Sequence, residues 1–155
     1  MTAEERLLEL GITLPPVPPA AGLYLPVVRT GPLLFVSGQI PLQDGLPLRR
    51  GRCGESVSLD EGAELARHCA LQALAIIREN LGTLDRVLRV VRVGGYVASG
   101  VAFNEQPRVI NGASQLLIDV FGEAGRHARL AIGVAELPLG VPVEVEFLFE
   151  ARPGG

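Results

Sequence analysis

The stretch from Arg129 to Ala151 constrains the fold most, because it holds two strand patterns in succession. In residues 129–135 the larger apolar residues alternate with alanine or glycine, and in residues 141–151 valine and phenylalanine alternate mainly with glutamate. An alternation with a period of two is typical of a β-strand with one buried face. Arg129 shares its face of the first strand only with small residues, which leaves room before its guanidinium for a planar anion or another backbone.

The segment between the two strand patterns, residues 136–142, contains two prolines around a glycine and is typical of a tight turn. If the strands pair as a hairpin, Arg129 and Glu144 either lie near one end of it or belong to adjoining subunits, and the sequence leaves both open. A charge beside a strand and an alternating glutamate face are more often solvated surface than a site. The pattern alone therefore predicts the strands and not a site.

Length and composition limit the class of protein. A chain of 155 residues suits one compact domain, which buries roughly 68 to 70 per cent of its unfolded surface and needs no metal or disulfide to fold. A positive mean hydropathy of +0.33 favours burial of apolar surface by self-association. The formal net charge of −3 and the scattered arginines leave no electrostatic footprint for RNA or DNA. We therefore expect a homo-oligomer that binds no nucleic acid.

The cysteines and the N-terminal sequence bear on metals and location. Cys53 and Cys69 have no C-x-x-C spacing, and with two histidines they make no convincing zinc set. The start M-T-A-E-E-R lacks the features of a signal peptide, and the longest uncharged run is interrupted by five prolines. We therefore expect free thiols, no metal, no membrane segment and a cytoplasmic location.

The N-terminal region, residues 1–21, is expected to form a short helix and a proline-rich linker. Thr2 and Glu5 have capping-box spacing before a leucine-rich stretch, and four prolines follow in the linker. A single domain then covers residues 22–155. Tyr24 near its start could direct its hydroxyl into a site, although a tyrosine at a strand entry is more often packing.

A short apolar strand is expected at residues 33–37, from Leu33 to Ser37, and Gly38 and Gln39 end it. A glycine at this position lets a ligand approach the backbone, although a glycine required merely for a bend or bulge is the commoner case. Asp44 and Gly45 form a pair that is typical of a hairpin turn.

Two amphipathic helices are expected in the rest of the domain. The first is capped by Ser58 and stopped by Gly82, and the second begins near Pro107 and ends at Gly122. Residues 84–98 between them are rich in valine and are expected to form an interior strand. The order of strands, helix, strand, helix and strands predicts an α+β sheet layered on two helices.

Two sequence blocks together resemble the Rid family, also called YjgF-like and often named endoribonuclease L-PSP. They are L-L-F-V-S-G-Q-I-P at residues 33–41 and R-x(7)-L-P-x(5)-E-x-E, which begins at Arg129. The resemblance covers residues 22–151. It implies a chorismate-mutase-like α+β fold with a mixed β-sheet and two main helices packed on one face. It also implies a homotrimer with ligand sites in the clefts between subunits, and hydrolysis of imines.

The resemblance also implies roles for individual residues. Arg129 would grip the carboxylate of the substrate and Glu144 would hold the attacking water. Arginine's planar fork matches the carboxylate of a 2-imino acid, and a substrate with so reactive a C=N bond requires no metal or organic cofactor. The implied site comprises Arg129, Glu144 and Tyr24 as catalytic residues and Ser37, Gly38 and Asn111 as substrate-binding residues.

Several positions depart from the family pattern and indicate a divergent subgroup. One extra residue separates Asn111 from Arg129, Ala131 stands where a cysteine is frequent, and His127 stands where proline is more usual. The leading helix and proline linker are additions. These differences bear on the shape of the pocket and on the substrate range.

Three functional hypotheses follow from these observations. The first is a deaminase that hydrolyses 2-imino or enamine acids, such as 2-aminoacrylate, to a 2-keto acid and ammonia. The second is a non-catalytic trimer that binds small carboxylates as a sensor or chaperone-like module. The third is a ribonuclease, which follows only from the family's common name and is disfavoured by the acidic charge balance.

Overall fold

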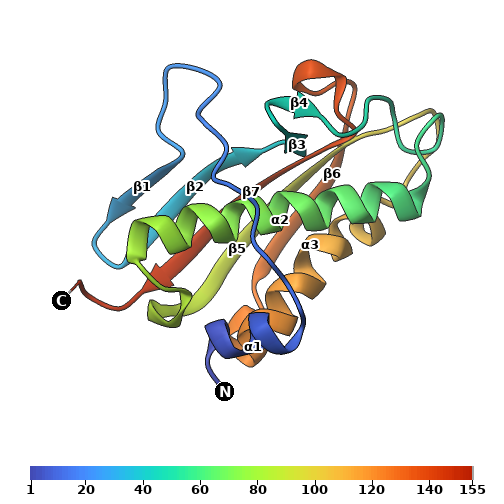
Figure 1. The fold of residues 1–155 in the computed structure, drawn as a ribbon. Coiled ribbons are helices and arrows are strands. Elements are labelled where there is room, and N and C mark those ends of the chain that lie inside the picture. Colours follow the sequence, from blue (N-terminus) through green and yellow to red (C-terminus); the bar gives the residue numbers. More distant parts are fainter. Residues whose placement is uncertain (155) are drawn as a thin grey trace.

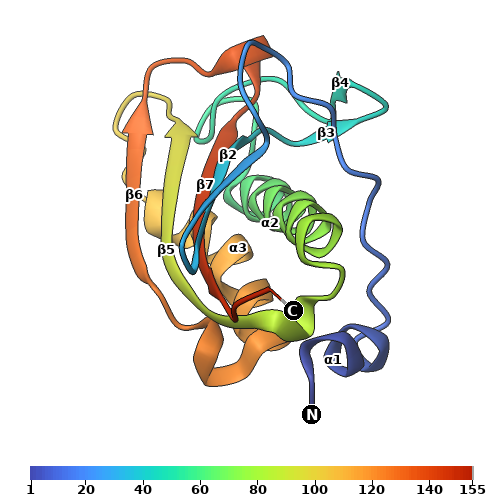
Figure 2. The same ribbon diagram turned by 90° about the vertical axis from the view of Figure 1, so that its left-hand side faces the viewer.

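The computed structural model describes residues 1–154 and contains one five-stranded mixed sheet with helices on one face (Figures 1 and 2). Neighbouring strands are antiparallel except for β5 and β6, which run parallel. The predicted α+β class with a mixed sheet and two main helices is confirmed. The strand order across the sheet is β1 (Val27–Thr30), β2 (Leu33–Gln39), β7 (Val143–Ala151), β5 (Val87–Ala98) and β6 (Ala128–Val134).

Strand β7 is the central strand, and its alternating sequence divides the two faces of the sheet. Val143, Val145 and Phe147 are buried, whereas Glu144 and Glu146 are partly exposed. Because successive side chains on a strand point to opposite faces, the valines and phenylalanine face the helices and the glutamates face the uncovered side. We call this uncovered side the open face of the sheet.

Strands β6 and β7 do not form a hairpin, because β5 lies between them. The turn η3 (Pro138–Gly140) leads from the edge strand β6 to the central strand β7. Strand β5 pairs in parallel with β6 and antiparallel with β7. The hairpin interpretation is therefore wrong. Strands adjacent in sequence usually pair, but the valine-rich β5, buried on its helix side, takes the interior position.

Two long helices, α2 (Leu59–Leu81) and α3 (Gln106–Phe121), cover one face of the sheet (Figure 2). Helix α2 begins with the predicted capping box, in which the side chains of Ser58 and Glu61 each accept a hydrogen bond from the other's backbone N–H. It ends at Gly82, whose φ of 87° is readily adopted only by glycine. Both predicted helices are therefore confirmed.

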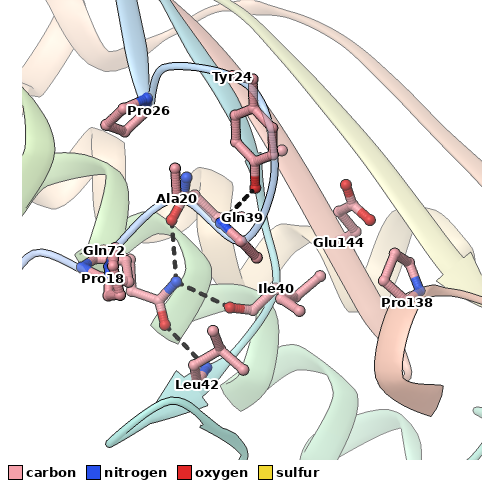
Figure 3. Close-up of a pocket in the computed structure, with 13 residues that line it drawn as sticks. Pro18, Ala20, Tyr24, Pro26, Gln39, Ile40, Leu42, Gln72, Pro138 and Glu144 are labelled. Carbon is pink, nitrogen blue, oxygen red and sulfur yellow. Dashed lines mark hydrogen bonds between the residues drawn. The ribbon is translucent and has the colours of Figure 1, made fainter.

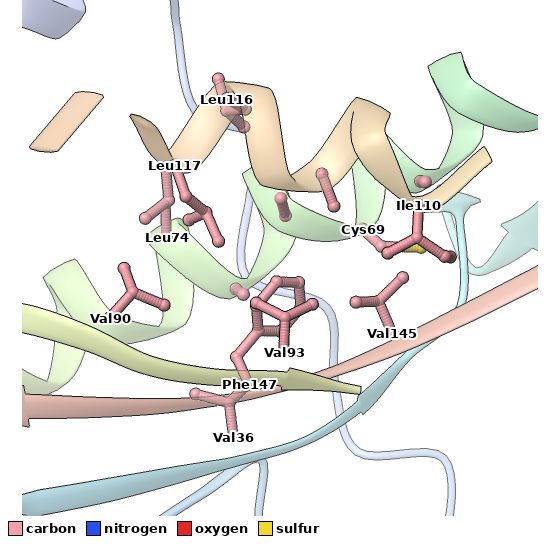
Figure 4. Packing of buried hydrophobic residues seen from close by; sticks show 14 of the residues in the cluster. Val36, Cys69, Leu74, Val90, Val93, Ile110, Leu116, Leu117, Val145 and Phe147 are labelled. Carbon is pink, nitrogen blue, oxygen red and sulfur yellow. The ribbon is translucent and has the colours of Figure 1, made fainter. Parts of the chain in front are cut away.

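The core lies between these helices and the sheet (Figure 4). The helices approach each other so closely at Gly112 that a Cβ there would collide with the backbone carbonyl of Ala63. Cys53 and Cys69 are both buried as free thiols. The largest fully buried side chains include Phe149, Leu34, Leu74, Ile77, Ile110 and Leu117.

Two short elements adjust the predicted boundaries. The predicted turn at Asp44 and Gly45 is confirmed, with φ of 53° and 77°, and joins β3 (Leu42–Gln43) to β4 (Leu46–Pro47). Residues predicted to begin the strand at 84–98 instead form the 3-10 turn η1 (Leu84–Arg86).

This turn is stabilised locally. The Thr83 side chain accepts a hydrogen bond from the Asp85 N–H, so that β5 begins only at Val87. A further 3-10 turn, η2 (Gly122–Gly125), joins α3 to β6.

Helix α1 (Ala3–Glu9) packs on the domain near α3 and η1. Its Leu7 is buried, and the Glu4 carboxylate accepts hydrogen bonds from the Arg78 guanidinium at 2.5 and 3.1 Å and from the Leu84 N–H at 2.9 Å. Residues 10–22 then pass in front of α2 as the blue segment of Figure 1. Three linker side chains pack against the core, namely Ile12, Leu14 and Val17.

No helix within residues 1–154 is both long and apolar enough to cross a bilayer.

Candidate functional site

A cavity of about 100 Å³ opens beside the end of β7 that carries Glu144 (Figure 3). Tyr24 and Gly38, predicted from the sequence, line it together with Glu144. The remaining wall is largely apolar and comes from residues 18–21 of the N-terminal linker, from Pro26, Ile40 and Leu42, and from Pro138. We call this group the glutamate half-site.

Gly38 is required at this position because the Glu144 carboxylate lies directly over it. The pairing of β2 with β7 shifts register between Val36 and Gln39, and this irregularity places Gly38 against the glutamate. A Cβ at Gly38 would lie far inside van der Waals contact with Glu144 Oε2. The register shift agrees with the bulge that is the commoner reason for a glycine here, and within the chain it is the Glu144 side chain that approaches Gly38.

The environment of Glu144 favours its protonated form. Burial raises the pKa of this carboxyl group, and the negative charge of Glu146 raises it further. No donor within residues 1–154 forms a hydrogen bond with the Glu144 carboxylate. By contrast, Glu146 accepts a hydrogen bond of 2.8 Å from the Tyr96 hydroxyl and forms an ion pair of 3.4 Å with Arg92. A carboxylate with a raised pKa and no fixed partner is suited to act as a general base.

Tyr24 and Ser37 are held by backbone groups. The Tyr24 hydroxyl accepts a hydrogen bond of 3.3 Å from the Ala21 N–H, and its side chain remains half exposed at the mouth of the cavity. The Ser37 hydroxyl donates to the Leu25 carbonyl at 2.6 Å and does not line the cavity. Ser37 therefore shapes the chain that leads from Tyr24 into the first strands.

Gln72 of α2 lies at the base of this cavity and was not identified from the sequence. Its amide donates to Gln39 Oε1 at 3.1 Å and to the Ile40 carbonyl at 2.9 Å, and its oxygen accepts from the Leu42 N–H at 3.0 Å. Gln72 is buried, with 2 % of its surface exposed. A polar residue on the apolar stripe of a helix is the signal that could have revealed it.

Arg129 lies on the edge strand β6 and points toward α3. Its Nη1 donates to Asn111 Oδ1 at 2.6 Å and to Ser114 Oγ at 3.2 Å. The structure thus brings Asn111 to Arg129 in spite of the extra residue between them. Within residues 1–154, Nη2 and Nε have no acceptor, and these two donors are available to a ligand. We call Arg129 and its polar neighbours the arginine half-site.

His127 and Ser114 complete the arginine half-site. His127 Nε2 lies 2.9 Å from Ser114 Oγ, and Nδ1 lies 2.6 Å from the Gly125 carbonyl oxygen. Burial lowers the pKa of His127, and the charge of Arg129 lowers it further, although the hydrogen bond to Gly125 opposes this change. Ser114 was missed from the sequence because a serine within a helix carries no distinct signal.

One chain does not bring its two half-sites together. Arg129 is aligned with Val93 of β5 and Glu144 with Tyr96 of the same strand. A shift of three residues along the strands and two strand spacings across them places the two Cα atoms roughly 14 Å apart. Their side chains also lie on opposite faces, since Val93 is buried beneath the helices while Glu144 lies on the open face.

No group of three or more histidine, cysteine, aspartate or glutamate side chains within residues 1–154 is arranged to hold a metal ion. Burial raises the pKa of Cys53 to about 11, and burial raises that of Cys69 well above its usual value. Both thiols are thus poor nucleophiles.

A mixed sheet with two helices on one face matches the chorismate-mutase-like class of α+β proteins. Residues 4–151 match the family model described as "YjgF/chorismate_mutase-like, putative endoribonuclease". The chain belongs to this family, also known as the Rid family.

Individual relatives agree over nearly the whole chain. Protein TCP17 of Trypanosoma cruzi is 48% identical over 146 residues, which cover 94% of this chain and 91% of that protein. The crystal structure of Atu1372 from Agrobacterium tumefaciens is 42% identical, with a TM-score of 0.87 over 97% of this chain and 94% of that chain. A structure from Shewanella oneidensis, named as an endoribonuclease, has 35% identity and a TM-score of 0.92 over 97% and 99% of the two chains.

Proposed function

We propose that the protein is a hydrolytic deaminase of 2-imino and enamine acids, with active sites formed where the arginine half-site of one subunit meets the glutamate half-site of the next. The observation that carries this proposal is the division of the site. Arg129 has free donors for a carboxylate, Glu144 has the properties of a base, and the fold holds them apart on opposite faces.

The chemistry requires both halves. Nη2 and Nε of Arg129 bind the substrate carboxylate as a fork, which fixes the adjacent C=N carbon. Glu144 takes a proton from a water molecule while the water oxygen bonds to that carbon and the C=N electron pair moves to nitrogen. The same proton then passes to the nitrogen and gives a carbinolamine. Glu144 next takes the hydroxyl proton of the carbinolamine and delivers it to the nitrogen, so that the C=O bond forms as the C–N bond breaks and ammonia leaves. Imino acid and water thus become keto acid and ammonia, without an oxidant or a cofactor.

The open face supports the assembly of several subunits. Its exposed apolar side chains include Phe35, Leu130 and Ile132, with 46%, 37% and 40% of their surface accessible. Apolar residues gathered on one face of a sheet favour contact with another copy of the chain. We propose that this face is the interface of a homotrimer, which the family resemblance implies.

The test is a coupled assay in which an amino-acid oxidase generates imines and semicarbazide traps those that remain. The protein should lower the rate of trapping, and Arg129→Ala should lose about 1.5 to 3 kcal/mol of binding to the carboxylate. This loss corresponds to a decrease in kcat/KM on the order of ten- to a hundredfold. Arg108→Ala is the matched control, because the exposed Arg108 side chain bonds only Glu105 among the described residues.

The result separates the proposal from its alternatives. Near-normal turnover by Arg129→Ala would refute the assignment. Binding of 2-oxo acids without any turnover would identify a carboxylate-binding module. RNA cleavage that survives purification and disappears in Arg129→Ala would instead support the activity for which the Shewanella oneidensis relative is named.

A further inference from the structure

Behind Arg129 lies a chain of hydrogen bonds that the proposed reaction does not use. It runs from the Gly125 carbonyl to the His127 ring, from the ring to the Ser114 hydroxyl, and from that hydroxyl to Arg129 Nη1, at 2.6, 2.9 and 3.2 Å. We call it the Arg129 relay. Its members come from three elements, since Gly125 ends η2, Ser114 lies on α3, and Arg129 lies on β6.

The chemistry of the partners fixes the direction of every bond in the relay. A carbonyl oxygen can only accept, so Nδ1 of His127 carries a proton and donates to Gly125. In the neutral ring Nε2 then has a free lone pair and accepts from the Ser114 hydroxyl. The Ser114 oxygen in turn accepts from Arg129, whose guanidinium can only donate. The relay has these bond directions only while His127 is neutral.

The other members of the relay are less exposed than Arg129. Arg129 is exposed and His127 is half-buried, while Ser114 has only 8% of its surface accessible. An exposed arginine normally samples many rotamers, and a ligand must restrict them on binding. Here Ser114 and Asn111 hold Nη1, and the other guanidinium nitrogens bond no group within residues 1–154.

We propose that His127 is a positioning residue which, through Ser114, holds Arg129 ready for the substrate carboxylate and makes the affinity for that carboxylate depend on pH. The proposal rests on the proposed function, because it takes Arg129 as the carboxylate ligand. His127 itself touches Ser114 and the backbone and does not enter the reaction.

Protonation of His127 reverses the bond between the ring and Ser114. Nε2 then donates to the Ser114 oxygen, the Ser114 hydroxyl proton loses its acceptor on the ring, and the imidazolium repels the guanidinium of Arg129. The charged residues near His127 are Arg129, two positions along the chain, and Arg89, Arg126 and Glu150, which line a hollow together with His127. The pKa of His127 lies below its ordinary value. Carboxylate affinity should therefore be constant near neutral pH and weaken in mildly acidic solution.

Direct binding of pyruvate tests the relay separately from turnover. Titration calorimetry would give Kd from about pH 5 to about pH 8 for the wild type and for His127→Leu, His127→Gln and Ser114→Ala. Glutamine places an acceptor near the position of Nε2 and cannot titrate, whereas leucine supplies no acceptor. Gln115→Ala is the control on α3, because Gln115 bonds only the exposed Asp119.

We expect His127→Leu and Ser114→Ala to raise Kd about three- to tenfold at neutral pH, which is the effect of one lost hydrogen bond, and to abolish the acid dependence. His127→Gln should restore the affinity without the acid dependence. In the imine assay the same variants should raise KM and leave kcat nearly unchanged. Urea unfolding of each variant identifies any loss of folded protein.

Three results would overturn the proposal: unchanged affinity in His127→Leu, tighter binding of pyruvate at acid pH, or covalent labelling of Ser114 by a fluorophosphonate, which would identify a nucleophile. Failure of the proposed function has a different signature. Arg129→Ala would then bind pyruvate as well as the wild type does. If Arg129→Ala weakens binding and His127→Leu does not, only the relay is wrong.

Discussion

Replacement of Gly38 by alanine should separate catalysis from stability. The added Cβ would overlap Glu144 Oε2, which is the far end of a flexible side chain rather than backbone. The carboxylate must therefore retreat by about 1 Å to reach ordinary contact. A displacement of that size at a reacting group lowers the rate about a hundredfold.

The cost in stability should be small by comparison. The φ angle of Gly38 is not in the left-handed region, so alanine meets no backbone strain, and a compatible glycine-to-alanine change stabilises by about 0.4 to 1 kcal/mol. This gain offsets part of the cost of moving the glutamate. We expect the free energy of unfolding to change by about 1 kcal/mol or less, as measured by urea denaturation.

A second replacement tests the cause of the lost activity. In Gly38→Ala combined with Glu144→Asp, the shorter side chain withdraws the carboxylate from the new methyl group. The double variant should therefore lose less than the product of the two single losses in kcat/KM. Full activity in Gly38→Ala, or a loss of activity that merely follows the loss of folded protein, would refute the reasoning.

Two further predictions concern the glutamate half-site. Glu146→Gln removes a negative charge that, together with burial, raises the pKa of Glu144, so the pKa of Glu144 should decrease. Because Glu144 acts as a base only when deprotonated, the rate rises with pH through this pKa, and the acid limb of kcat/KM should move to lower pH. An unmoved limb would exclude Glu144 as the titrating base. Ala20→Leu should fill a cavity of about 100 Å³, so that kcat/KM decreases more for imines with long side chains than for the smallest imine, measured across an oxidase-generated panel. Equal decreases would show that residue 20 does not line the side-chain pocket.

The sequence predicts the elements of this fold better than their arrangement. Strand alternation around Phe147 and the capping boxes at Thr2 and Ser58 are local signals, since each depends on residues a few positions apart. The pairing of β5 with both β6 and β7 depends on contacts between distant segments. The valine-rich pattern of an interior strand does not specify which strands it pairs with, so periodicity cannot reveal that β5 lies between β6 and β7.

The candidate site shows the same limit. The resemblance predicted Arg129 and Glu144 because their types and spacing match the second sequence block, and it predicted Asn111 by residue type in spite of one extra residue before Arg129. Gln72 and Ser114 act through hydrogen bonds to groups more than ten residues away, on other elements. The linker residues 18–21 line the cavity only because α1 and the core hold the linker across α2. Apart from the place of Gln72 on the apolar stripe of α2, these contacts leave no local pattern.

The division of the site between subunits leads to a quantitative test by mixing. Arg129→Ala keeps an intact glutamate half-site, and Glu144→Gln keeps an intact arginine half-site. If the two variants are unfolded together in equal amounts and refolded as a cyclic trimer, each site draws its two halves from neighbouring subunits at random. About one quarter of the sites should then contain both intact halves.

The mixture should therefore recover about one quarter of the wild-type activity, although each variant alone has little. Mixing without unfolding provides the control, since stable trimers should exchange subunits slowly. When wild-type chains are added, the recovered activity should increase with the square of the fraction of chains that carry an intact copy of a given half-site, because every site requires two intact contributors. If Arg129 and Glu144 of the same chain acted together, the mixture would show only the average activity of the two variants. That result would mean that a separation of roughly 14 Å within one protomer does not prevent the two residues from acting on one substrate.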